Sequence, residues 1–286
     1  MGVFLTHVLL NLLVCFVAGF VFFDAVSWLV LSWKANPTYA HSPLVIVLSV
    51  FLFCLKLGKS VKRGDIEYPQ FSLKKLPASL PWLFLAIPLI VCGTYFKLNF
   101  CLILGLLFLF RAWLHFLYGR ETSQQFNFPV FFPALTIPLP YLPEITNILQ
   151  LWLAKLITLL LSALGYEMAE LGSRIAIRGS WFQISPACVG FNSLIILLTL
   201  MILLIYLMRM PKWVEVTLMF LTLPIAMVSN FLRITLVLLI SNYYGVESAM
   251  KYWHIFSGYF FYFSALLSML IVWLILVRGK VGRAEL

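Results

Sequence analysis

The sequence has very little charge. Of its 286 residues, 10% are charged and 63% are hydrophobic. In a soluble globular chain, about a quarter of the residues are charged. This composition excludes a soluble enzyme. The 26 Phe, 12 Tyr and 9 Trp also exclude a disordered chain, because they supply more apolar surface than is needed to offset the entropy of ordering. We therefore expect an integral membrane protein.

Metal and disulfide patterns are missing too. The five Cys and four His show no zinc or disulfide spacing, and no His-Glu-x-x-His pattern supports a metal-dependent membrane hydrolase. We expect no metal and no cofactor. Cys15, Cys54, Cys92 and Cys101 lie in apolar runs, where cysteine usually packs as a small hydrophobe. No internal repeat or soluble domain is visible, so we expect one integral-membrane domain over residues 1–286.

Long hydrophobic runs dominate the sequence. A helix that rises ~1.5 Å per residue needs about 20 residues to cross a ~30 Å hydrocarbon core. The runs predict an all-α, polytopic transmembrane helical bundle of about eight spanning helices. The first run has no basic start and no Ala-x-Ala cleavage site, so it is expected to be a retained helix. The expected spans are residues 3–31, 43–57, 81–97, 99–118, 147–165, 187–208, 214–241 and 253–277.

A further apolar stretch, residues 126–143, is interrupted by proline. Each proline removes a backbone donor and fixes φ, so a straight spanning helix would leave carbonyls unpaired in lipid. We expect a proline-broken, re-entrant segment packed against protein. Its prolines are Pro129, Pro133, Pro138, Pro140 and Pro143.

The basic residues then separate by side. If residues 126–143 do not cross, thirteen Lys and Arg fall on one side and five on the other, with Lys155 and Arg233 inside spans. By the positive-inside rule, both termini are cytoplasmic, and loops 32–42, 166–186 and 242–252 face outward. The basic excess thus reflects topology in a cytoplasmic (inner) membrane and gives no reason to expect nucleic acid. The thirteen are Lys56, Lys59, Lys62, Arg63, Lys74, Lys75, Arg111, Arg120, Arg209, Lys212, Arg278, Lys280 and Arg283.

Cys188 opens the sixth expected span. Ser185 is a suitable N-cap and Pro186 suits the first helical position, which puts Cys188 in the first turn. The positive end of a helix dipole favours the thiolate, which is the nucleophilic form of cysteine. The alternative is that Cys188 is an inert packing residue at a helix start.

Two further residues lie at outer span ends. Arg233 lies about 12 Å inside the seventh span at ~1.5 Å per residue, so it should face the bundle interior. His254 opens the last span and is the type of side chain that exchanges protons near neutral pH. The alternatives are a structural ion pair for Arg233 and an interface hydrogen bond for His254. A thiolate, a cation and an acid/base are the components of acyl transfer.

With these residues the chain resembles the exosortase/archaeosortase family of membrane-embedded cysteine transpeptidases. Four blocks between about residues 110 and 260 carry the resemblance, in the family's order. They are Phe-Pro-Val-Phe-Phe with Ile-Pro-Leu-Pro at 128–140, Ala-Cys-Val-Gly-Phe-Asn-Ser at 187–193, Asn-Phe-Leu-Arg-Ile at 230–234 and His-Ile-Phe-Ser-Gly at 254–258. Val189 and Asn192 depart from the family motif Ala-Cys-Ser-Gly-Leu-Arg-Ser.

The resemblance implies a mechanism and a substrate class. Cys188 attacks a peptide carbonyl to form a thioester that an acceptor resolves, Arg233 stabilises the oxyanion, and His254 is the general acid/base. Substrates of such enzymes are membrane-anchored proteins with a C-terminal tripartite signal of the PEP-CTERM type: a short motif such as Pro-Glu-Pro, a transmembrane helix and a basic tail. The active site then faces the periplasm or outside.

Four more residues are candidates for substrate binding: Asn192, Asn230, Arg174 and Arg178. The two arginines flank an alternating stretch, residues 174–178, which predicts a short extended piece that ends at Gly179. Trp181 and Phe182 are expected at the membrane interface. The main alternative function is a small-solute transporter without covalent chemistry, because broken helices also mark transport sites.

Overall fold

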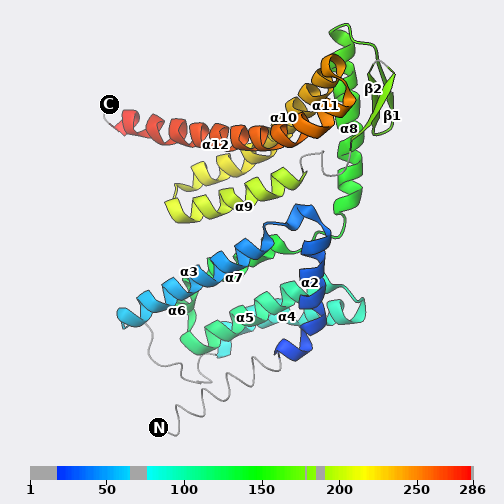
Figure 1. Cartoon of the computed structure of the whole chain (residues 1–286). Coiled ribbons are helices and arrows are strands. Elements are labelled where there is room, and N and C mark those ends of the chain that lie inside the picture. Colours follow the sequence, from blue (N-terminus) through cyan, green and yellow to red (C-terminus); the bar gives the residue numbers. More distant parts are fainter. Residues whose placement is uncertain (1–17, 65–75, 178, 185–190, 285–286) are drawn as a thin grey trace. The chain divides into compact units, whose positions relative to one another are not determined.

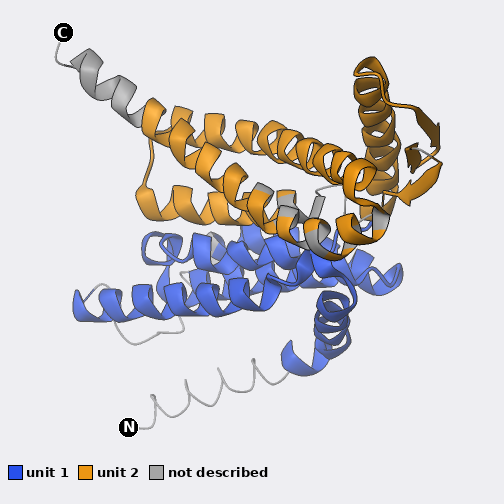
Figure 2. Cartoon of the chain, turned by 45° about the horizontal axis from the view of Figure 1, so that its top comes forward, with its two compact units in different colours: residues 1–140 blue, residues 141–286 orange. Residues whose placement is uncertain are grey.

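Helices make up most of the structure, a computed structural model that describes residues 18–64, 76–177, 179–184 and 191–284. The chain divides into two compact units, Met1–Pro140 and Tyr141–Leu286 (Figure 2). The predicted all-α polytopic fold is confirmed, with one small sheet added to it. The prediction of a single domain stays a prediction beside this division.

The described part of unit 1 contains four longer helices, two of which form an antiparallel hairpin, and several short helical turns that connect or follow them (Figure 1). Its described elements are α2 (Phe23–Ala35), η1 (Pro37–Tyr39), α3 (Ser42–Lys62), α4 (Leu76–Tyr95), α5 (Asn99–Tyr118), α6 (Arg120–Gln124), α7 (Asn127–Phe131) and η3 (Phe132–Thr136).

Two glycines set the close packing of α4 on α5. A Cβ atom added at Gly93 would lie 2.7 Å from Leu102 Cγ, and one added at Gly105 would lie 2.7 Å from Ile90 Cγ1. No side chain larger than hydrogen fits at these distances without a shift. Small residues at helix contacts are the usual means of bringing transmembrane helices together.

The proline-rich stretch is broken as expected. It forms α7 and the 3-10 helix η3, each five residues long, and both pack against α3, while α7 also packs against α5. Its backbone groups find partners in side chains of other helices. Trp33 Nε1 donates to Thr136 O at 2.8 Å, and Leu139 N donates to Tyr39 Oη at 2.9 Å. Satisfied backbone groups are what an irregular segment needs at membrane depth.

Polar side chains also hold the entry of this stretch. Lys56 Nζ donates to Gln125 O, and Ser60 Oγ donates to Gln125 Oε1 at 2.9 Å. Arg111 Nε donates to Asn127 Oδ1 at 2.5 Å. Arg111 is 0% exposed and lies inside α5, so it belongs with Lys155 and Arg233 as a basic residue within an expected span, which corrects its count among the thirteen of one side. A guanidinium this deep in an apolar helix must face protein, because lipid cannot solvate it.

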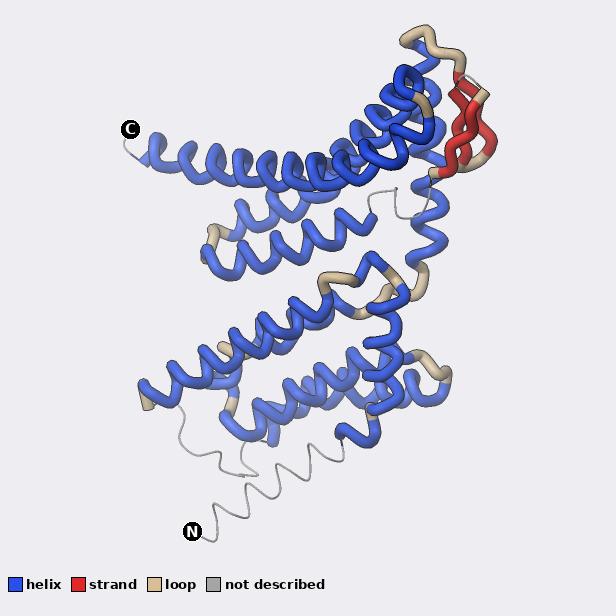
Figure 3. The backbone as a smooth tube through the Cα atoms, in the orientation of Figure 1, coloured by secondary structure: helices blue, strands red, loops and turns tan. Residues whose placement is uncertain are grey.

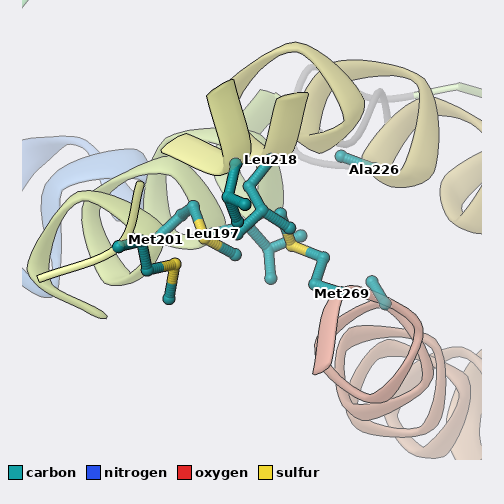
Figure 4. Close-up of a cluster of buried hydrophobic side chains, with 8 residues drawn as sticks. Leu197, Met201, Leu218, Ala226 and Met269 are labelled. Carbon is teal, nitrogen blue, oxygen red and sulfur yellow. The ribbon is translucent and has the colours of Figure 1, made fainter. Parts of the chain in front are cut away.

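Unit 2 contains the three longest described helices. Its elements are α8 (Leu142–Ala163), β1 (Met168–Leu171), β2 (Arg174–Ile177), β3 (Ser180–Gln183), α9 (Phe191–Met208), α10 (Lys212–Tyr244), α11 (Val246–Ser248), the π-helical turn η5 (Ala249–Trp253) and α12 (His254–Ala284). Leu197 and Met201 of α9, Leu218 and Ala226 of α10, and Met269 of α12 form a shared buried core (Figure 4).

The sheet lies beside α8 (Figure 3). Its order is β1-β2-β3, both pairs are antiparallel, and the two connections are tight hairpins. Ile175 is fully buried and packs with Ala154, Ile157 and Leu161 of α8. The extended piece predicted at 174–178 corresponds to β2, whereas β1 and β3 were not predicted.

Apolar helices match seven of the expected spans. Within the described residues, helices long and apolar enough to cross a membrane are Pro37–Lys62, Asn99–Tyr118, Leu142–Ala163 and Lys212–Tyr244, and shorter apolar helices are Ser79–Tyr95, Leu194–Met208 and Tyr262–Ile275. Most of the first expected span lies outside the described residues. The count of eight spans stays a prediction.

One expected loop is largely helical. The sequence suggested an outward loop over residues 242–252, but α10 continues to Tyr244 and helical structure resumes at Val246. Gly245, at φ 83°, separates the two helical segments. Glycine adopts this left-handed conformation without the steric cost that a side chain brings.

Candidate active site

Helix α10 is the centre of unit 2 and packs against α8, α9, η5 and α12. Ala226, Asn230 and Val237 are buried and lie on one side of it, and Arg233 falls on the same stripe by helical spacing. Asn230 is 4% exposed, and Arg233 is half-buried with its Nε atom buried. Arg233 lies eleven residues before the end of α10, or about 16 Å along the axis.

Helices α9 and α10 form an antiparallel hairpin with its turn at residues 209–211. Asn192 lies seventeen residues before Arg209, and Asn230 lies nineteen residues after Pro211. At ~1.5 Å per residue, the two positions are at similar heights, about 26 and 29 Å from the turn. The N-terminal end of α9 therefore lies level with Asn230 and Arg233.

Helices α10 and α12 form a second antiparallel pair, with the reversal at Gly245. His254 lies nine residues after Gly245 and Arg233 lies twelve before it. These separations correspond to about 14 and 18 Å, so the two positions differ by about one helical turn in height. The π-helical turn η5 directly precedes His254, and such turns occur frequently at functional sites.

The sheet leads the chain toward the same region. Ile184 follows β3, and its backbone is held on both sides: Ile184 N donates to Ser173 O at 3.0 Å, and Gln150 Nε2 of α8 donates to Ile184 O at 2.9 Å. Ile184 also packs in one cluster with Phe231 and Ile234, which flank Arg233 on α10. The chain thus enters residues 185–190 from a fixed point next to the Arg233 segment.

Arg174 and Gln183 are opposite each other on β2 and β3. Arg174 Nε donates to Gln183 Oε1 at 2.9 Å, and Gln183 Nε2 donates to Ser173 Oγ at 2.7 Å. All three side chains are on or near the exposed surface of the sheet. The arrangement presents Arg174 to solvent while it fixes the Gln183 side chain.

The structure describes some of the candidate residues in full and others only in part. Asn230, Arg233 and Arg174 are described in full. Asn192 and His254 are placed by their helices, and their side chains lie outside the described part. Cys188 and Arg178 lie outside the described residues, so the role expected of each stays a prediction.

Sequence reasoning missed Gln150 and Gln183. Gln150 is 5% exposed and lies on the buried face of α8, one turn after the buried Thr146. A glutamine on the mainly apolar face of a helix was a usable signal, because a buried amide nearly always has a partner. Gln183 carried no comparable signal, since its partner is set by the register of β2 and β3.

No metal centre emerges from the described residues, since they contain no group of three His, Cys, Asp or Glu side chains positioned to hold an ion. By helical rise, one cation, one amide and two helix starts lie within about two helical turns of one another in height.

A family model described as transmembrane exosortase (Exosortase_EpsH) matches residues 33–273. The match covers most of both units and every candidate site residue. Neither a curated protein nor a solved structure matches the chain significantly.

Proposed function

The chain belongs to the transmembrane exosortase family, and from that premise we propose that it is a protein-sorting transpeptidase with Cys188 as its nucleophile. Family membership indicates a multi-pass membrane protein with a transpeptidase type of function that acts on protein substrates. The proposal adds the catalytic residues, the steps of the reaction and the substrate signal.

In the proposed reaction, the Cys188 thiolate attacks the carbonyl carbon of a substrate peptide bond. Arg233 donates hydrogen bonds to the oxyanion that develops on the carbonyl oxygen. The tetrahedral intermediate collapses with cleavage of the C–N bond, and His254 gives a proton to the departing amine. The acyl group is then held as a thioester on Cys188. An acceptor nucleophile attacks the thioester, His254 takes its proton, and Cys188 leaves as the thiolate.

The observation that supports this assignment is that three positions lie at similar heights along α10, which pairs with α9 on one side of the chain and with α12 on the other. The start of α9, Arg233 and the start of α12 lie within about one or two helical turns of each other. Cys188 is four residues after Ile184 and three before Phe191, so covalent geometry alone keeps its Cα within about 14 and 11 Å of theirs.

The remaining candidates have supporting roles in this proposal. Asn230 lies one helical turn from Arg233 on the buried stripe, where its amide orients the guanidinium or the substrate carbonyl. Asn192 acts from the start of α9. Arg174 and Arg178 attract an acidic group of the signal. The two units form one integral-membrane domain, with the catalytic residues all in Tyr141–Leu286.

The excess of basic residues on one side supports the orientation. Both termini are cytoplasmic, and the site faces the periplasm or outside of the cytoplasmic membrane. A substrate anchored by its own transmembrane helix, with a basic tail retained in the cytoplasm, then presents the residues before that helix on the side of the site.

Co-expression with reporter proteins tests the proposal. Each reporter ends in a candidate motif such as Pro-Glu-Pro, a transmembrane helix and a basic tail. The wild-type protein should release the tail. Cys188→Ala and His254→Ala should stop release, and Arg233→Ala should reduce it by at least about 10²-fold, while each protein still inserts. Cys92→Ala, at an exposed cysteine of α4, is the matched control and should process normally.

Normal processing by the Cys188→Ala protein would contradict the proposal and favour the transporter alternative. Failure of the wild-type protein to process any reporter of the panel would contradict it as well.

A further inference from the structure

Strand β3 is the last strand of the described sheet, and the direction of its backbone groups follows from one hydrogen bond. Ile184 N donates to Ser173 O, so this opposite pair is a hydrogen-bonded one. Hydrogen-bonded and non-bonded pairs alternate along antiparallel strands. Phe182 therefore bonds to β2, whereas the N–H and C=O groups of Trp181 and Gln183 point away from it. We name these four groups the outer edge of β3.

Nothing in the strand protects this edge. Open edges are usually blocked by Lys, Pro or a bulge, and β3 reads Ser-Trp-Phe-Gln, without any of them. Trp181 is 53% exposed, and Gln183 is exposed with its side chain fixed to Arg174 and Ser173. The sheet is held from its other side, because Ile175 and Ile184 pack on α8 and α10.

The edge also lies directly before the candidate nucleophile. Gln183 is five residues before Cys188, which is at most about 18 Å of extended chain. Arg174 of β2 lies opposite Gln183 and is hydrogen-bonded to it, so its guanidinium is on the sheet surface that Trp181 and Gln183 share. Glu170 of β1 lies opposite Ile175 and is on the other surface. The surface next to the outer edge of β3 therefore carries a guanidinium, which complements an acidic segment.

We propose that the outer edge of β3 is the docking site for the extended segment of the substrate that precedes its transmembrane helix. The inference rests on the proposed function and deepens it. The segment adds a fourth strand to the sheet, so its main chain supplies the binding and its alternate side chains supply selectivity. Side chains on the Trp181 side meet an aromatic ring and the Arg174 guanidinium, which favours an acidic residue there.

Proline substitutions test the backbone contacts. Gln183→Pro removes an N–H that points off the sheet and leaves the bonds between β3 and β2 in place, which edge strands tolerate. Processing of the reporter should fall about tenfold below that of Gln183→Ala, which removes the side chain alone. Glu170→Pro is the matched control, because its N–H points off the opposite edge, at β1, by the same alternation. Its processing should stay within about threefold of wild type.

Cross-linking gives a second readout that needs no turnover. In a Cys188→Ala background, Gln183→Cys should form disulfides with single cysteines placed along the substrate segment, at every second residue. Leu171→Cys, on the same sheet surface but at β1, lies two strands, or about 10 Å at ~4.8 Å per strand, farther from the added strand and should form none.

The two proposals fail in different ways. If the wild-type protein cleaves the reporter but Gln183→Pro and Gln183→Ala cleave it equally, docking at β3 is wrong and the transpeptidase stands. Cross-links without the two-residue period, or equal cross-links from Leu171→Cys, overturn docking as well. If the wild-type protein cleaves no reporter, the transpeptidase assignment itself fails, and a lack of periodic cross-links to bound reporter then overturns docking separately.

Discussion

Gln150 and Ile184 are joined by a buried hydrogen bond from the side-chain amide of α8 to the backbone carbonyl that follows β3, at 2.9 Å. Because Ile184 N is bonded to Ser173 O, both backbone groups of Ile184 are satisfied. Helix α8 thereby fixes the point from which the chain continues to Cys188. This makes Gln150 a positioning residue for the nucleophile in the proposed reaction.

Gln150→Leu should slow processing without preventing membrane insertion. The substitution leaves the Ile184 carbonyl buried without its donor, which costs about 1–3 kcal/mol. We expect kcat for tail release to fall about tenfold or more with KM little changed, because the nucleophile is displaced while docking is retained. Thr146→Val is the control one turn away, since Thr146 Oγ1 bonds only to its own helix at Leu142 O. Equal rates for the two variants would contradict a positioning role.

Arg233→Ala should reduce processing by about 10²–10³-fold, the usual effect of losing an oxyanion donor. Arg233→Lys should recover only part of this, because an ammonium cannot reproduce the forked geometry of a guanidinium. Single-turnover rates of thioester formation measure the effect directly. Lys155→Ala, which removes an exposed cation of α8, should react as wild type. If both variants, Arg233→Lys and Arg233→Ala, were fully active, Arg233 would have no part in the chemistry.

Arg111 and Asn127 should behave as a coupled pair in unit 1. Arg111 is fully buried under the Trp82 ring, 5.2 Å from its centroid, and neither Nη atom has a hydrogen-bond partner within the described part of the chain. Asn127→Ala therefore removes the acceptor of the remaining nitrogen, Nε, and should cost about 1.5–3 kcal/mol, the usual contribution of a hydrogen bond to a charged group.

The double variant Arg111→Met/Asn127→Ala should be more stable than Asn127→Ala alone, because it removes the stranded charge. Thermal unfolding of the purified protein in detergent, arranged as a double-mutant cycle, measures the coupling. Simple additivity of the two substitutions would mean that the pair does not interact.

Gly105 and Gly58 should respond in opposite ways to alanine. An added Cβ at Gly105 meets Ile90 Cγ1 at 2.7 Å and backbone atoms just beyond 3 Å, whereas one at Gly58 of α3 has nothing within 4 Å. Gly105→Ala should destabilise by about 1–3 kcal/mol through overpacking. Gly58→Ala should be neutral or stabilising by up to about 1 kcal/mol, because alanine is the better helix former. The same thermal unfolding assay tests both, and a loss of stability in Gly58→Ala would argue against the packing described for α3.

The sequence predicted what depends on local pattern. Apolar length predicted the helices, the prolines at 129–143 predicted the break, and alternation at 174–178 predicted β2. It did not predict β1 and β3, whose side chains alternate less clearly and whose pairing depends on the register with β2. Nor did it predict that helix would resume at Val246, because the polar residues before His254 resemble a loop, and packing of η5 on α10 outweighs that local preference.

Among the candidate residues, those whose burial in a membrane costs free energy were the easier to predict. Arg233 stood out because an arginine inside a span requires a reason. Arg111, seven residues before the end of α5, carried the same signal but was counted with the basic residues of one side. Gln150 and Gln183 act through partners 34 and 9 residues away, and partners of that kind are chosen by tertiary structure.

The most direct test of the central claim is mass spectrometry of the purified protein after brief incubation with a membrane-anchored reporter and no acceptor. The account predicts an acyl adduct of the reporter on the peptide that contains Cys188, released by hydroxylamine as expected of a thioester and absent from Cys188→Ala. A reporter cleaved without any adduct on Cys188, or an adduct that persists in Cys188→Ala, would contradict it.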